Sequence, residues 1–225
     1  MEKHTKILIG ALTIFIFLAV EAVMRNVKAY MLDSAFSILI SVLIYSTRKH
    51  WHVSHNSFAL IEFSLILHNL GVFGFYNISP ISIQWDRITH FMGILAATTG
   101  FFQFLEPHMK LIWTHQNFHL LAAVFFAALG VGAMIENVEY LGYLTLGFGE
   151  GGFMMGFGDV DFDTPPEGHT TDVPPRTMNE TELIRNLGGG WHNTELDLVT
   201  NLSAAAITTI VLSLRKWKFG KHNTY

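Results

Sequence analysis

Six stretches of the sequence contain almost no charged residues, and each is about 17–20 residues long. A helix of that length crosses the ~30 Å hydrocarbon core of a bilayer. The apolar runs are continuous rather than alternating, which excludes the strands of a membrane barrel. The sequence therefore predicts an all-α, polytopic membrane bundle of about six transmembrane helices. The predicted spans are Ile7–Met24, Ala29–Ser46, Ser57–Phe75, Ile88–Leu105, Phe118–Ile135 and Leu198–Leu214.

Composition supports a membrane protein over a soluble helical one. Half of the residues are hydrophobic and 14% are charged, whereas soluble domains carry about 25% charged residues. The lipid bilayer is therefore the expected partner, and residues 1–225 are expected to form a single membrane domain. The net charge of −4 and the lack of a basic stripe argue against a nucleic-acid partner. Because the chain has no cysteine, thiolate metal sites are excluded.

The distribution of lysine and arginine predicts the orientation. With six spans, nine of the fourteen basic residues fall on the side that carries both termini. The positive-inside rule places that side in the cytoplasm. We therefore expect a multi-pass protein of the inner or plasma membrane with both termini cytoplasmic. Residues 146–190, which are rich in glycine, proline and carboxylates, are then an extracytoplasmic loop.

Polar side chains gather at the outer ends of the last three predicted spans. Asp86 and His90 are four residues apart, and Glu136 and Glu139 are three apart, so each pair shares one face of its helix. The start of the last span carries a third set at four-residue spacing, and the span 57–75 adds a histidine in its outer half. These further residues are Asn193, Asp197, Asn201 and His68.

Small residues continue the same helix faces. Because small side chains let membrane helices approach closely, we expect the last three predicted spans to contact one another through these faces. The residues are Gly93, Ala97, Gly100, Gly130, Gly132, Ala204 and Ala205.

The charges in this group require a counterion. Four carboxylates face a single arginine, Arg87, so protons or a metal ion must offset the remaining charge. Carboxylate and imidazole ligands suit zinc, manganese or iron. The sequence predicts a divalent metal ion as the cofactor, or otherwise none. The candidate metal ligands are Asp86, His90, Glu136, Glu139 and Asp197.

Three segments together resemble a family of inner-membrane proteins. The sequences "WDRITHFMG", "IENVEY" and "HNTELDLVTNLSAA" are similar to the signatures of the YjdF-like proteins, within the wider VanZ-like group. The resemblance covers about Phe63 to Thr208. This chain departs from the pattern at Tyr140, where the family has Trp, and at Asn193. The VanZ-like group is associated with resistance to a lipid-tailed glycopeptide antibiotic, so the resemblance implies a role in the cell envelope.

Two classes of function and one structural interpretation remain open. The first is a metal-dependent enzyme acting on a lipid or lipid-linked substrate, with His90 or Glu139 as the catalytic base. The second is a transporter, or a membrane protein that binds an ion or small molecule, with the carboxylates as a relay. The third is a polar network that only fixes helix register. The remaining polar residues would contact the substrate or orient the ligands: Arg87, Asn201, His68 and Asn193.

Two other acidic residues within predicted spans receive structural interpretations. Asp33 lies near the outer end of the span 29–46, where its side chain could extend to water. Glu62 lies in the inner half of the span 57–75 and is expected to pair with an interfacial cation.

Overall fold

The fold is an antiparallel bundle of long helices, seen in a computed structural model that describes residues 2–24, 28–75, 80–110, 113–146 and 180–220. The main helices are α1 (Lys3–Met24), α2 (Lys28–Thr47), α3 (His55–Leu70), α4 (Trp85–Leu105), α5 (His115–Leu146) and α6 (Glu180–Gly220). A π-helical turn, Gly71–Phe75, continues α3, and a short 3-10 turn, Glu106–His108, follows α4. The predicted all-α bundle is confirmed.

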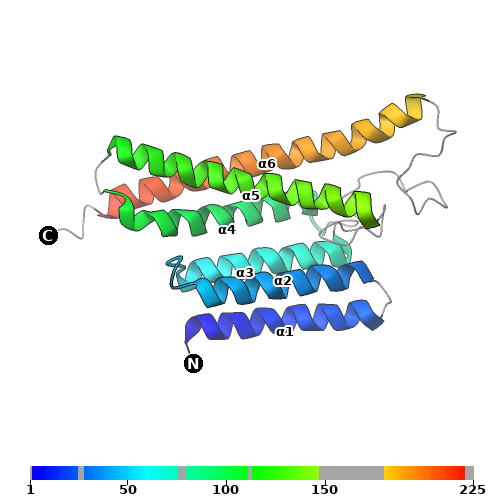
Figure 1. Ribbon diagram of the computed structural model, residues 1–225, viewed down its shortest axis with the longest axis horizontal. Helices are drawn as coiled ribbons and strands as arrows, with labels where there is room; N and C mark the ends of the chain where they lie inside the picture. The colour runs from blue at the N-terminus through cyan, green and yellow to red at the C-terminus, as the bar shows by residue number, and fades with distance from the viewer. Residues whose placement is uncertain (1, 25–27, 76–79, 111–112, 147–179, 221–225) are drawn as a thin grey trace.

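The helices form two groups of three, and within each group every helix contacts the other two. Figure 1 shows the group of α1, α2 and α3 beneath the group of α4, α5 and α6. Each helix runs opposite to the one before it, so the two termini lie at the same end of the bundle. Helices α3 and α4 connect the two groups, because they contact each other directly.

Within the described residues, four helical segments are long and apolar enough to cross a membrane: Lys3–Met24, Trp85–His108, His115–Val138 and Leu196–Lys218. The other two predicted spans form helices that run alongside them (Figure 1). The apolar part of α2 is shorter, Asp33–Thr47, and α3 has 16 residues before its π-helical turn. These two helices contain buried polar residues such as Ser37, Glu62 and Asn69. These residues lower the mean hydropathy of the two helices.

The group of α4, α5 and α6 has an apolar core where the three helices meet. Ile94 of α4, Ala128 of α5, and Ala204 and Ala205 of α6 are fully buried together. Large apolar side chains such as Phe126 and Leu214 are exposed on the outer faces, as expected for surfaces in contact with lipid. The predicted contact among these three spans is confirmed.

The small residues contribute unequally to this contact. Gly132 is pressed against α6, because a Cβ atom there would lie 2.8 Å from Nδ2 of Asn201. A Cβ atom at Gly93, Gly100 or Gly130 would meet nothing within 4 Å. The prediction that those three glycines are packing contacts is therefore wrong, because the true contact faces are rotated away from them.

Candidate functional site

The first turns of α4 supply two side chains of the site. Trp85, the first residue of the helix, is buried and donates its indole N–H to the carbonyl of Leu67 at 2.9 Å. Its ring also packs edge-on against Phe75, with the centroids 4.8 Å apart. These contacts fix the start of α4 against the end of α3. The next residue, Asp86, and His90 one turn later therefore lie at the end of the bundle opposite the termini (Figure 1).

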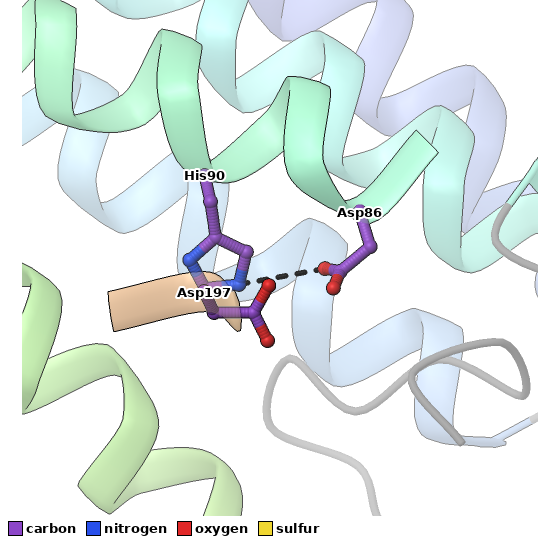
Figure 2. A group of neighbouring side chains, drawn as sticks. All are labelled: Asp86, His90 and Asp197. Carbon is purple, nitrogen blue, oxygen red and sulfur yellow. Dashed lines mark ion pairs between the residues drawn. The ribbon is translucent and has the colours of Figure 1, made fainter. Parts of the chain in front are cut away.

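Asp86, His90 and Asp197 meet at the contact between α4 and α6. Each offers one ligand atom, and these three atoms lie within 4.8 Å of one another. Figure 2 shows both carboxyl groups facing the imidazole of His90, with Oδ1 of Asp86 3.4 Å from its Nε2. All three residues are buried, and Asp197 is 1% exposed. The structure thus brings together three of the five predicted metal ligands.

Glu136 approaches the same histidine from α5. Its Oε1 lies 3.6 Å from Nδ1 of His90, the ring nitrogen opposite the one that faces Asp86. This distance is too long for a hydrogen bond, and neither atom has a hydrogen-bond partner among the described residues. Glu136 therefore lies beside the imidazole of His90 without forming a hydrogen bond to it.

Asn201 completes the buried surface one turn beyond Asp197. The residue is 1% exposed, and its amide group approaches His90. Neither its oxygen nor its nitrogen forms a hydrogen bond with a described residue. A buried amide that lacks hydrogen bonds costs about 1–3 kcal/mol for each group, and the Asn201 amide is therefore available to a group bound beside His90.

Arg87 supplies the positive charge beside this cluster. It is close enough to Asp197 for the two charges to interact, and its Nε is buried without a hydrogen-bond partner among the described residues. One arginine does not offset the three carboxyl groups of Asp86, Glu136 and Asp197.

His68 lies next to this cluster but pairs elsewhere. Its Nε2 is 3.6 Å from Oδ1 of Asp33 on α2. Asp33 is 1% exposed, so the prediction that it extends to water is wrong. The helix turns this carboxylate inward, towards α3. The serines at Ser34, Ser37 and Ser41 follow it at helical spacing, and this polar stripe is the sequence signal that could have identified a buried face.

Glu62 also differs from its prediction. Its Oε2 lies 2.7 Å from Oγ of Ser41, and no described Lys, Arg or His is within ion-pair distance. The expected interfacial cation is therefore not its partner, because Glu62 sits on the buried side of α3 facing α2. Two other predicted residues, Glu139 and Asn193, have side chains outside the described part of the chain.

Comparison with known proteins identifies a family without assigning a chemistry. Residues 4–218 match the model of a family described as predicted membrane protein (DUF2238). No curated protein matches the chain, and no solved structure matches it.

Proposed function

The chain belongs to the DUF2238 family of predicted membrane proteins, and we propose that its polar cluster binds a divalent metal ion that acts on a lipid or lipid-linked substrate. The observation that carries this proposal is the convergence of Asp86, His90 and Asp197 within 4.8 Å, next to an Asn201 amide that has no hydrogen-bond partner among the described residues. A cation offsets the carboxylates, which share a site of low dielectric constant.

The ligand types favour zinc, manganese or iron. Two carboxylates and one imidazole are oxygen and nitrogen ligands of hard or borderline character. Three protein ligands also leave a coordination position open, which is the arrangement of catalytic rather than structural zinc sites. In such a site, Glu136 would hold the imidazole of His90 in position. Histidines that bind metals commonly donate their second ring N–H to a carboxylate, which fixes the ring and its tautomer, and Glu136 faces that nitrogen at 3.6 Å.

The position of the cluster supports a substrate in the membrane surface. Asp86 and His90 occupy the first two turns of α4, so they lie within about 10 Å of the start of that helix. A lipid headgroup reaches this depth.

A divalent ion supplies Lewis-acid chemistry for phosphoryl or acyl transfer, and the planar guanidinium of Arg87 suits an anionic headgroup. Glu139 remains the predicted alternative base. The resemblance to YjdF-like and VanZ-like proteins supports a role in the envelope.

Elemental analysis of detergent-purified protein tests the metal site. We expect about one metal ion per chain after incubation with zinc, manganese or iron. The near-isosteric variant Asp197→Asn should lose the metal, as should His90→Ala. Glu136→Gln should still bind it, with an affinity about 10- to 100-fold lower, because it removes only the support of the imidazole.

A matched control uses a carboxylate at the opposite end of the bundle. Glu106 pairs with Lys216 at 3.4 Å, and its side chain is 44% exposed, so Glu106→Gln should bind metal as the wild type does. Folded wild-type protein that binds none of the three metals would contradict the proposal. If the protein binds metal but does not release headgroups from bilayer lipids, the proposed metal site is retained and the proposed enzyme activity is rejected.

If the protein releases no lipid headgroups, a non-catalytic function becomes the first candidate. The observation that favours it is the second polar pair, Asp33 and His68, beside the cluster. Buried ionisable groups on neighbouring membrane helices are typical of ion and proton pathways. Transport of an ion or small molecule is therefore the second candidate function.

A further inference from the structure

A second line of buried polar groups lies between α2 and α3, away from the cluster described above. Ser34 Oγ is 3.1 Å from Oδ1 of Asn69, and Nδ2 of Asn69 donates to Ser37 Oγ at 2.7 Å. One turn further along α2, Ser41 meets Glu62. All five residues are at most 3% exposed. The line ends at Glu62, whose Oε1 is buried without a hydrogen-bond partner among the described residues.

The hydrogen atoms available at Ser41 favour a protonated Glu62. Ser41 Oγ lies 2.8 Å from the carbonyl oxygen of Ser37 and 2.7 Å from Oε2 of Glu62. A hydroxyl group has one hydrogen, and it cannot be donated in both directions at once. If Ser41 donates to the carbonyl, a short contact with Glu62 needs a hydrogen on the carboxyl group. A protonated Glu62 satisfies both contacts, whereas an ionised one leaves the Ser37 contact without a hydrogen.

The charges around Glu62 lead to the same conclusion. Helices α1, α2 and α4 pack against α3, and none of their described titratable side chains lies within ion-pair distance of Glu62. Asp33 and His68 pair with each other at one end, and His4 and Tyr45 lie beyond Phe58 at the other. On α4, Asp86 and His90 belong to the polar cluster. An ionised carboxylate without a partner inside a membrane costs several kcal/mol, so the neutral acid is the stable form.

We propose that Glu62 is a membrane-embedded proton-binding site that is protonated at rest and exchanges its proton with the end of the bundle that carries Asp33 and His68. The path on that side is lined by the polar groups of Ser37, Asn69 and Ser34. The other side is closed by Phe58, one turn before Glu62. Phe58 is 0% exposed, and its ring packs against His4 and Tyr45 with centroids 5.8 and 6.1 Å apart.

A hydrophobic carbodiimide, dicyclohexylcarbodiimide, tests this assignment, because it modifies protonated carboxyl groups in apolar surroundings. We expect peptide mass spectrometry of the full-length protein in vesicles to find the adduct on Glu62 at neutral pH. The adduct should disappear in Glu62→Gln, persist in Ser41→Ala, and be absent from the exposed Glu106. Raising the pH on the side opposite the termini should reduce labelling, and raising it on the side of the termini should not.

Infrared spectroscopy gives a measurement that does not depend on a reactive probe. The wild type should show the carbonyl stretch of a buried carboxylic acid, and Glu62→Gln should lose that band. Glu62→Gln should also fold with wild-type stability, because glutamine resembles the neutral acid. Absence of both adduct and band at Glu62 would overturn the proposal. Protection of Glu62 by sodium ions would instead assign a cation site, and sensitivity to pH only on the side of the termini would refute the proposed path.

Discussion

At the scale of single residues, the contact between Gly132 and Asn201 determines how closely α5 approaches the polar cluster. A Cβ atom at position 132 would lie 2.8 Å from Nδ2 and 3.1 Å from Cγ of Asn201. Gly132→Ala therefore has to displace a buried side chain, at a cost of about 1–3 kcal/mol. We expect a lower unfolding temperature in detergent and, if the cluster binds metal, a weaker affinity.

Gly130 provides the matched control on the same helix. A Cβ atom there meets nothing within 4 Å, so Gly130→Ala gains helix propensity without a clash. We expect it to be neutral or to stabilise the protein by up to about 1 kcal/mol. Equal effects of the two substitutions would show that Asn201 does not pack against Gly132.

At the scale of helices, Trp85 connects the start of α4 to the end of α3 through a hydrogen bond. Trp85→Phe keeps an aromatic ring but removes the indole N–H that donates to Leu67 at 2.9 Å. The Leu67 carbonyl also accepts from the backbone N–H of Gly71, so it does not become unsatisfied. We therefore expect a loss of only about 1 kcal/mol, measured by thermal unfolding.

Trp113 is the control for this prediction. Its side chain is 60% exposed and contacts Trp217 with ring centroids 4.7 Å apart, so Trp113→Phe should change stability less than Trp85→Phe does. The reverse order would mean that the contact between α3 and α4 is not fixed by the indole.

At the scale of the whole molecule, the alternating helices place both termini at one end of the bundle (Figure 1). The described basic residues at that end include Lys3, Lys6, Arg48 and Arg215, and the positive-inside rule predicts that this end lies in the cytoplasm. A reporter that is active only outside the cytoplasm should therefore be active when inserted near Gly168 and inactive after Tyr225. Activity after Tyr225 would reverse the orientation and place the polar cluster on the cytoplasmic side.

The sequence alone determined the helices and the depth of their polar residues. Long apolar runs leave helices as the main solution in a membrane, and each residue advances the helix by about 1.5 Å. Position along a run is therefore also position along the membrane normal. For that reason Asp86, His90, Glu136 and Asp197 could be assigned to one end of the bundle before any contact was known.

Only the tertiary structure decided which way each helix faces. Gly130 and Gly132 are two residues apart, yet a Cβ atom would meet a neighbouring helix at Gly132 and not at Gly130. Asp33 and Glu62 were predicted to meet water and a cation, and they contact His68 and Ser41 instead. Rotation about a helix axis is set by packing against neighbours, which hydropathy does not encode when both the lipid and the protein interior are apolar. Depth can therefore be predicted from the sequence of a membrane helix, whereas its partners depend on the assembled bundle.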